Sequence, residues 1–252
     1  MGKTMNLTLK VWRQKNAQSE GRLETYALQG VDADASFLEM LDILNTQLEK
    51  RGEEPVAFEH DCREGICGCC GAVVNGQAHG PLRETTLCQL HMRHFNDGDT
   101  IVIEPWRSRA FPLIKDLVVD MEPFFAHYRA VMPYFVNDAP PPADGRERLQ
   151  SEEDRARFDD TTKCILCACC TTSCPSFWAS GRYVGPAAIV QAHRFIFDSR
   201  DQAGGERLKI LAEPGGVWRC RTIFNCTTAC PRDIEVTRAI GEVKLAIVRG
   251  AK

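Results

Sequence analysis

Two hydrophobic periodicities divide the chain into a first part with strands and a second part with helices. Residues 5–13 (MNLTLKVWR) alternate apolar and polar side chains, which predicts a β-strand. Residues 25–28 and 100–104 predict two more strands. A short strand at residues 72–74 precedes Asn75-Gly76, a dipeptide that favours a hairpin turn.

One amphipathic helix is predicted within this first part. Ser36 is its expected N-cap, and Glu39, three residues later, completes a capping box. The apolar side chains that recur at helical spacing are Phe37, Met40, Leu41, Leu44 and Leu48. This stripe indicates core packing rather than a cofactor site.

The second part of the chain has the pattern of a helical protein. Helices are predicted at residues 121–132, 185–199 and 234–248, and a further one begins at Ser151. Residues 137–145 (NDAPPPADG) have the composition of a linker. We therefore predict an α+β chain made of three segments: a first domain at residues 1–120, a connecting helix and linker at 121–150, and an all-α domain at 151–252.

Thirteen cysteines among 252 residues are the unusual feature of the composition. No stretch approaches the ~20 apolar residues that cross a bilayer, and the N-terminus shows no leader pattern, so we expect a reducing compartment. Cysteines there bind metals more often than they form disulfides. The net charge of −3 divides into −5 for residues 1–120 and +2 for residues 121–252. Neither part shows the concentrated basic face of a nucleic-acid binder, so we expect no nucleic-acid partner.

The first group of cysteines follows the spacing C-x4-C-x2-C with a distant fourth member: Cys62, Cys67, Cys70 and Cys88. This is the plant-type ferredoxin spacing, which binds a [2Fe–2S] cluster. Gly65, Gly68 and Gly71 let the backbone come close to such a cluster. Strands, one helix and a cysteine loop in this order predict a β-grasp ferredoxin domain.

A second and a third group come from two runs that superpose at an offset of 56 residues. The first run, C-x2-C-x2-C-x3-C-P, has the bacterial ferredoxin spacing, in which the fourth cysteine reaches the other cluster. If the last cysteine of each run binds the cluster of the other run, a [4Fe–4S] cluster is assigned to Cys164, Cys167, Cys170 and Cys230. The same exchange assigns the remaining cluster to Cys174, Cys220 and Cys226, with Ile223 where the first run has Cys167. Three thiolates and an aliphatic corner favour a [3Fe–4S] cluster, so the second domain is expected to be a two-cluster ferredoxin.

These cysteines also have other interpretations. Disulfides or structural zinc are alternatives, but zinc favours closed sets of four ligands and one set here has three. His79, His91 and His94 lie near Cys88, so a Rieske-type site is conceivable, although packing or hydrogen bonding near the cluster fits them better. Cys69 and Cys169 remain without a cluster and are expected to be small buried thiols that point away from it. The reverse register, with Cys69 as ligand in place of Cys70, stays open.

The sequence resembles the iron–sulfur subunits of succinate dehydrogenases and fumarate reductases over nearly its whole length. The motifs that carry the resemblance are CREGICG at 62–68, CILCACC at 164–170, SCPS at 173–176, GP at 185–186, RF at 194–195, DSRD at 198–201 and TIFNC at 222–226. It implies a membrane-associated respiratory-chain and tricarboxylic acid cycle enzyme, in which this subunit binds no substrate and has no catalytic residue. Electrons would pass from FAD in a flavoprotein subunit through the [2Fe–2S], [4Fe–4S] and [3Fe–4S] clusters to a membrane quinone. The chain would be held at the cytoplasmic side of a bacterial cell membrane by anchor subunits.

The resemblance breaks at two positions that are usually tied to quinone. Family members that reduce ubiquinone usually carry a second Trp and a His where this chain has Ala179 and Arg221. Pro175, Ser176 and Trp178 do match, so these three and Arg221 are the candidate residues near quinone. The two replacements favour menaquinone or a relocated site.

Three other functions compete with this one. The same relay run in reverse would serve a quinol:fumarate reductase. A relay subunit of another flavoenzyme, of the glycolate-oxidase or heterodisulfide-reductase kind, would resemble only the second half and usually carry two complete cysteine runs. A zinc-stabilised interaction module would be colourless, whereas an iron–sulfur protein is brown.

Overall fold

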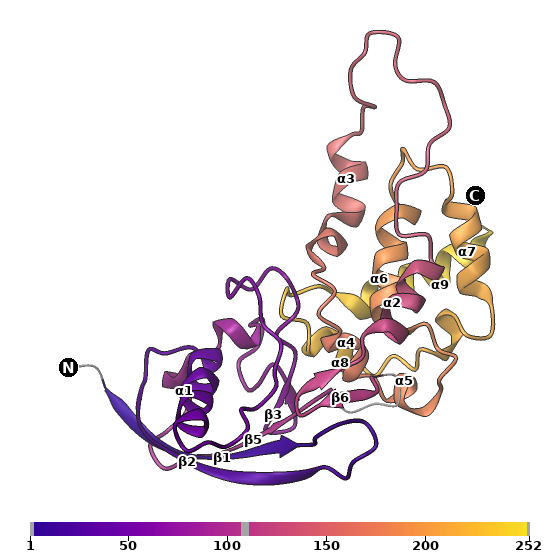
Figure 1. Cartoon of the computed structure of the whole chain (residues 1–252). Helices are drawn as coiled ribbons and strands as arrows, with labels where there is room; N and C mark the ends of the chain where they lie inside the picture. The colour runs from indigo at the N-terminus through magenta and orange to yellow at the C-terminus, as the bar shows by residue number, and fades with distance from the viewer. Residues whose placement is uncertain (1–2, 107–110, 251–252) are drawn as a thin grey trace.

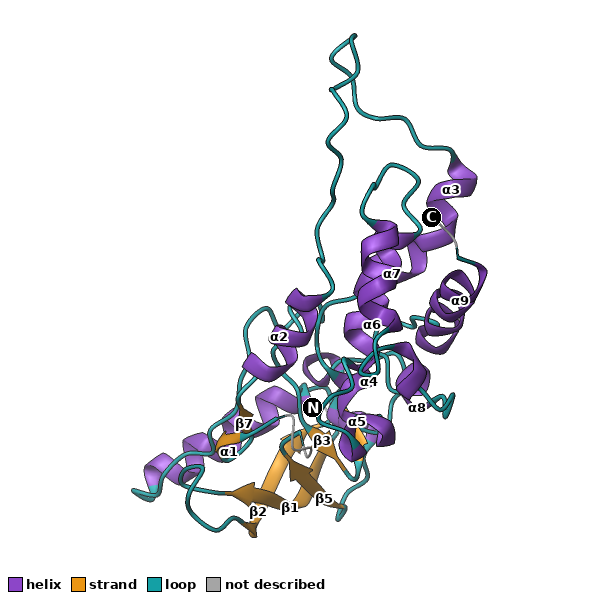
Figure 2. Cartoon of the chain, turned by 90° about the vertical axis from the view of Figure 1, so that its right-hand side faces the viewer, coloured by secondary structure: helices purple, strands orange, loops and turns teal. Residues whose placement is uncertain are grey.

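The computed structural model describes residues 3–106 and 111–250. Residues 107–110, in the connection after the strand at 100–104, lie outside the described residues. A sheet with one long helix forms one end of the molecule, and the helices of the second half form the other (Figures 1 and 2).

The first half folds around a five-stranded mixed sheet with the strand order β2-β1-β5-β3-β4. Its strands are β1 (Thr4–Arg13), β2 (Arg22–Asp32), β3 (Val73–Val74), β4 (Gln77–Ala78) and β5 (Thr100–Glu104). β1 pairs antiparallel with β2 and parallel with β5, while β5 pairs antiparallel with β3. The parallel pairing of the first and last long strands, crossed by one helix, is the arrangement that the β-grasp prediction requires (Figure 1).

The helix that covers this sheet is α1 (Phe37–Lys50), and its predicted capping box is present. The Glu39 backbone N–H donates to Ser36 Oγ at 3.2 Å, and the Ser36 N–H donates to Glu39 Oε2 at 2.6 Å. All five residues of the predicted stripe are buried, together with Leu38. The stripe packs against the inward side chains of β1 and β5, such as Leu9 and Ile101, in one hydrophobic core.

The turn between β3 and β4 has the geometry that its sequence predicts. Asn75 and Gly76 both have positive φ, 50° and 80°, as a two-residue hairpin turn of type I′ demands. Asn75 Oδ1 also accepts the Val102 N–H at 2.8 Å, which ties the turn to β5. The hairpin thereby delivers His79 to the side of the sheet that faces the helical half.

A second hairpin and a helix follow the sheet. The hairpin consists of β6 (Leu113–Lys115) and β7 (Val118–Val119), and α2 (Glu122–Ala130) comes after it. The hairpin was not predicted, because its strands of three and two residues are too short to show a periodicity. The Pro-rich segment between α2 and α3 projects far above the helices as a long loop (Figure 1).

The second half is helical as predicted. Its α-helices are α3 (Glu152–Asp159), α4 (Cys169–Thr172), α5 (Pro175–Ala179), α6 (Gly185–Ile196), α7 (Gly204–Ala212), α8 (Asn225–Thr228) and α9 (Val236–Arg249). Its short 3-10 helices are η3 (Asp160–Lys163) and η4 (Val217–Arg219), while η1 (Leu87–Gln89) and η2 (Met92–His94) lie in the first half, between β4 and β5. α6 is buried along most of its length and packs against both α7 and α9. α7 was not predicted.

The two cysteine runs, which are offset by 56 residues, also have matching backbone conformations. Leu166 and Ala168 have positive φ of 57° and 63°, and the equivalent Thr222 and Phe224 have 56° and 70°. A one-turn helix follows each pair, α4 and α8, and these two helices lie against each other. The two cysteine runs therefore share one backbone path, including at Ile223.

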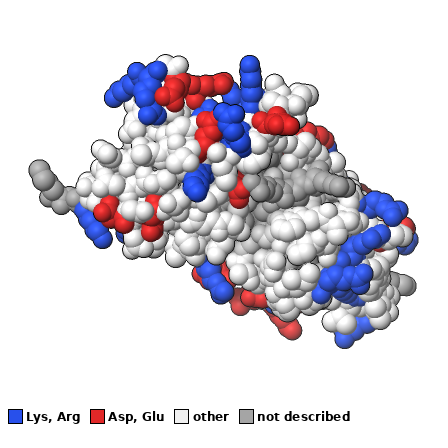
Figure 3. Space-filling model, turned by 90° about the horizontal axis from the view of Figure 1, so that it is seen from below, with Lys and Arg blue, Asp and Glu red and all other residues white. Residues whose placement is uncertain are grey.

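Two hydrophobic cores correspond to the two halves. The first contains α1, β1, β5 and Leu117, and the second contains residues from Trp106 onward, including Phe111 and Val119. The boundary at residue 120 stays a prediction, because the two cores interleave between residues 106 and 119. Within residues 3–106 and 111–250, no helix combines the length and apolar character needed to traverse a bilayer. On the face seen from below, charged side chains lie mostly toward the edges (Figure 3).

Candidate iron–sulfur cluster sites

The first predicted group converges in the loop between α1 and β3 and at η1. Cys70 and Cys88 are buried, and their sulfurs face each other, with Cys67 close to both Cys70 and Cys62. Burial and, after it, the charge of the neighbouring Cys88 sulfur raise the pKa of Cys70 to about 12. Thr86 Oγ1 lies 3.2 Å from Cys88 Sγ, which places a hydroxyl beside that sulfur.

Backbone N–H groups of this loop are directed at sulfur. The Glu64 N–H donates to Cys62 Sγ at 3.3 Å, and the Cys69 N–H donates to Cys67 Sγ at 3.5 Å. The N–H groups of Glu64 and Ile66 lower the pKa of Cys62 to about 7. A loop that stabilises thiolates in this way suits an anionic cluster.

The two unassigned cysteines differ from one another. Cys169 is fully buried, as predicted. Cys69 is exposed, so the prediction of a buried thiol was wrong for it. Cys69 follows Cys67 along the outer side of the loop and lies beside Asp61, whereas Cys70 turns inward to Cys88. This geometry supports Cys70 rather than Cys69 as the member of the first group.

The second predicted group lines a cavity in the helical half. Cys164, Cys167, Cys170 and Cys230 all border it, together with Ala187 and Val190 of α6. Burial raises the pKa of Cys170 well above its usual range, and the sulfurs of Cys164, Cys167 and Cys230 raise it further. Two of the four cysteines are buried and two are half-buried. Four thiolates this close together repel one another, so this arrangement fits a group whose positive iron ions offset their charge.

The third predicted group lines a neighbouring cavity. Its sulfur donors are Cys174, Cys220 and Cys226, and Ile223 lies on the same wall. The Thr222 N–H donates to Cys220 Sγ at 3.4 Å, and Thr237 Oγ1 lies 3.5 Å from Cys226 Sγ. Tyr183 also borders this cavity, and its fully buried hydroxyl has no hydrogen-bond partner among the described residues. An unpartnered buried hydroxyl beside three thiols fits a cavity built for an acceptor group.

The three groups lie in series through direct contacts. A Cβ atom at Gly68 would be 2.3 Å from the Ile165 carbonyl oxygen and 3.1 Å from the Cys167 nitrogen, so the first and second cysteine loops touch through their backbones. The second and third groups adjoin, since the Cys226 sulfur acts on the pKa of Cys170 and α4 packs against α8. The order along this line is first, second, third.

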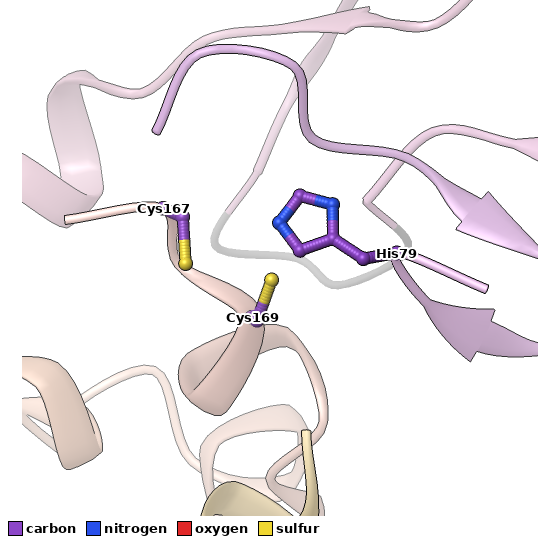
Figure 4. Close-up of side chains that lie close together, drawn as sticks. All are labelled: His79, Cys167 and Cys169. Carbon is purple, nitrogen blue, oxygen red and sulfur yellow. The ribbon is translucent and has the colours of Figure 1, made fainter. Parts of the chain in front are cut away.

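The three histidines near Cys88 have separate environments. His91 Nδ1 lies 2.9 Å from the Gln89 carbonyl oxygen, and His94 is exposed in η2. The His79 ring lies at the second group, where Cys167 and Cys169 are beside it (Figure 4). Sequence reasoning missed this contact because it joins residues 88 positions apart, in different halves of the chain. A hydrogen bond from Cys169 lowers the pKa of Cys167 well below its usual range, and His79 acts in the same direction.

The candidate quinone residues divide between two places. Pro175, Ser176 and Arg221 border the cavity of the third group. Trp178 borders a separate groove between the β3–β4 hairpin and α8, and its indole N–H donates to the Thr172 carbonyl oxygen at 2.6 Å. Ile223 and Phe224 are about half exposed, at 48% and 54% of the residue surface, next to the third group.

The chain combines a β-grasp unit that contains a plant-type cysteine loop with a helical unit that contains two paired cysteine runs. This combination defines the class: an iron–sulfur protein with two ferredoxin-like units. Residues 8–126 match the family of 2Fe-2S iron-sulfur cluster binding domains, and residues 156–231 match the 4Fe-4S dicluster domain. The predicted α+β fold class and its order of ferredoxin units are thereby confirmed.

Comparison with whole chains gives the particular family. The chain is 38% identical over 224 residues to the succinate dehydrogenase iron-sulfur subunit of Coxiella burnetii, which covers 88% of this chain and 90% of that one. It is 38% identical over 228 residues to the subunit of the same name from Paracoccus denitrificans, with 90% and 82% covered. A chain of the Mycobacterium smegmatis Sdh1 complex in the apo form has the same fold, with a TM-score of 0.81, 23% identity and coverage of 99% and 98%. The chain belongs to the family of succinate dehydrogenase iron–sulfur subunits.

Proposed function

We propose that this chain carries electrons from the flavin of a flavoprotein subunit to a quinone in the membrane, as the iron–sulfur subunit of a succinate:quinone oxidoreductase. Electrons would pass through a [2Fe–2S] cluster at Cys62, Cys67, Cys70 and Cys88. They would continue to a [4Fe–4S] cluster at Cys164, Cys167, Cys170 and Cys230, and then to a [3Fe–4S] cluster at Cys174, Cys220 and Cys226. Iron–sulfur clusters accept and donate single electrons, and the protein tunes them through hydrogen bonds, charge and burial.

The observation that carries this proposal is the serial contact of the three cysteine groups. The Gly68 backbone touches the loop of the second group, and the second group adjoins the third. This role requires no succinate-binding site in this chain, because the substrate would be oxidised in the flavoprotein.

The partners follow from the two ends of the series. We propose that the flavoprotein docks beside Cys62 and Cys67, where the apolar residue Ile66 is 58% exposed. The anchor subunits would then cover the apolar side chains of Ile223 and Phe224 beside the third group. The peripheral position on the cytoplasmic side of a bacterial membrane, and the preference for menaquinone that Ala179 and Arg221 suggest, belong to the same proposal.

The test uses the purified complex. Iron analysis is expected to give about nine iron atoms per chain, the sum of two, four and three. Succinate should reduce the [2Fe–2S] and [3Fe–4S] clusters, as followed by EPR, and mass spectrometry of extracted lipids should detect menaquinone. Two results would refute the relay: a metal content that is mainly zinc, or clusters that stay oxidised when succinate and the flavoprotein are both present.

A further inference from the structure

His79 belongs to the first half of the chain but lies against the second cysteine group. It follows β4, has a φ of 61°, and is only 1% exposed. One ring nitrogen of His79, Cys167 Sγ and Cys169 Sγ all lie within 4.8 Å of one another. Figure 4 shows that the nitrogen nearest the two sulfurs is Nε2, the one farther from the point where the ring joins its side chain.

The hydrogen bonding of the other ring nitrogen settles where the proton is. The Leu87 backbone N–H donates to His79 Nδ1 at 3.2 Å, so Nδ1 is an acceptor and a neutral ring carries its proton on Nε2. Nε2 has no hydrogen-bond partner among the described residues. The Trp106 ring packs against the imidazole edge-on, with centroids 5.7 Å apart, and holds its orientation. His79 therefore presents a fixed N–H donor to the sulfurs.

We propose that His79 donates a hydrogen bond from Nε2 to the Cys167 thiolate of the [4Fe–4S] cluster, so that the [2Fe–2S] domain raises the reduction potential of the cluster in the other domain. The inference rests on the proposed function, since it takes Cys167 as a cluster ligand. A hydrogen bond to a cluster sulfur stabilises the more negative, reduced state, and the low-dielectric surroundings strengthen that effect.

The electron and proton balance of this role is simple. One electron leaves the reduced [2Fe–2S] cluster and is taken up by the oxidised [4Fe–4S] cluster, while the proton on Nε2 stays in place. The added negative charge on the second cluster is met by the Nε2–H dipole. His79 therefore makes this first transfer between clusters more favourable without joining in any covalent step.

Two substitutions separate the donor from the support that the ring gives. The side chain in His79→Asn is too short to place its amide N–H at the position of Nε2 but keeps an acceptor for the Leu87 N–H, and Asn tolerates the left-handed backbone of this position. His79→Gln reaches farther and places an amide N–H near the position of Nε2. Both are measured in the assembled complex by redox titration with EPR detection of each cluster.

In the Asn variant, the reduction equilibrium of the [4Fe–4S] cluster is expected to shift about tenfold toward the oxidised state, which is about 59 mV for a one-electron couple. The [2Fe–2S] and [3Fe–4S] potentials should stay in place, and the Gln variant should recover part of the shift. An exchangeable proton coupled to the reduced [4Fe–4S] cluster should disappear from electron–nuclear double resonance spectra in the Asn variant only.

Three outcomes would overturn the inference: an unchanged [4Fe–4S] potential in a fully loaded Asn variant, a shift of all three potentials together, or zinc bound by His79, Cys167 and Cys169. If the Asn variant fails to assemble, the Gln variant alone tests the inference. Its amide N–H takes the position of Nε2, so absence of the exchangeable proton from the spectra of the Gln variant would contradict the donor role. Failure of the proposed function would look different, as absent iron or inert clusters in the wild-type complex.

Discussion

The Gly68 backbone lies directly against the Ile165 carbonyl oxygen, and a Cβ atom at residue 68 would be only 2.3 Å from it. Gly68 has a φ of +77°, so its position combines a left-handed backbone with a close approach between two chain segments. The contact brings the loop that contains Cys67 onto the loop that contains Cys167. A contact between two backbone segments thus sets the distance between the first two clusters, and backbone atoms in contact leave this distance little freedom to vary.

Gly68→Ala should therefore push the two loops apart. We expect weaker magnetic coupling between the reduced [2Fe–2S] and [4Fe–4S] clusters and a slower turnover with succinate. Gly30→Ala is the matched control, because Gly30 has a φ of +67° and no atom within 4 Å of an added Cβ. Both variants carry a left-handed Ala, a cost of roughly 1–2 kcal/mol. Equal EPR spectra in the two variants would show that the contact does not set the distance.

Ile223→Cys should complete the third cluster. Ile223 lies between residues with φ of 56° and 70°, and Cys167 lies between residues with nearly the same values, 57° and 63°. A thiol at residue 223 is thus carried on the backbone path that presents Cys167 to its cluster. Conversion from [3Fe–4S] to [4Fe–4S] should abolish the EPR signal of the oxidised three-iron cluster and add about one iron atom per chain.

The control for that change is Ile223→Ser, which has the size of Cys without its thiolate. It should keep the three-iron signal. Survival of the signal in a folded Cys variant would contradict the ligand register.

Tyr183→Phe removes a single oxygen atom from the wall of the third cavity. The Tyr183 hydroxyl is buried without a partner among the described residues, and burial followed by the Cys220 and Cys174 sulfurs raises its pKa, so it stays protonated. As a donor to the [3Fe–4S] cluster it would stabilise the reduced state. We expect the Phe variant to have a [3Fe–4S] potential lower by up to about 59 mV, equivalent to a tenfold change in the equilibrium.

Redox titration checks this prediction, with the [2Fe–2S] potential as the internal reference. A potential equal to that of the wild type would mean that the hydroxyl does not reach the cluster.

Arg221→Ala tests the candidate quinone contact. Arg221 borders the cavity of the third group and is exposed, so its replacement should not disturb the fold. We expect a higher KM for the quinone, a lower [3Fe–4S] potential, or both, because a positive charge beside the cluster would be lost. Unchanged KM, turnover and potential would exclude Arg221 from either role. Arg219→Ala is the control, because Arg219 is a nearby half-buried arginine that is not part of the lining of this cavity.

Arg207→Ala should destabilise the helical half strongly. Arg207 and Asp201 form an ion pair at 2.6 Å with both side chains fully buried. The guanidinium also donates to the carbonyl oxygens of Met132 and Tyr134 at 3.0 and 2.6 Å, which holds the segment after α2 onto α7. Loss of one partner from a buried pair costs roughly 3–5 kcal/mol.

The measurement for this variant is the temperature at which visible cluster absorption is lost in matched heating scans. Arg200→Ala breaks a pair with Asp198 in which the arginine is 32% exposed, so its effect should be much smaller. Equal losses in the two variants would contradict the role given to burial.

Elements with local signals were predictable from the sequence. β1, β5 and α1 appear where periodicity and the Ser36–Glu39 box place them, because each of these signals lies within a few residues of chain. The cysteine runs were equally readable, since cluster chemistry fixes their spacing. The β6–β7 hairpin is too short to show a period. α7 begins with Gly204 and Gly205, which obscure its start.

The features that tune the site were not predictable in the same way. His79 and Tyr183 act through contacts with segments distant in sequence, and nothing in their own neighbourhoods indicates which sulfur each will face. Their common signal is structural: each has a buried polar atom beside a group of thiols, with no hydrogen-bond partner in the part of the chain that the structure describes. Cys69 shows the reverse error. The sequence predicted a buried thiol there, but the course of the loop leaves Cys69 exposed.

The backbone contact at Gly68 also bears on how the protein matures. Cys167 is 8% exposed and lies beside His79 at the junction of the two halves, so docking of the halves narrows the access of a carrier that delivers iron and sulfide. Loading of the four-iron site would then be easier before the two halves close. The junction would in this way act as a checkpoint, at which an empty chain stays open and recognisable to the assembly machinery of the cell.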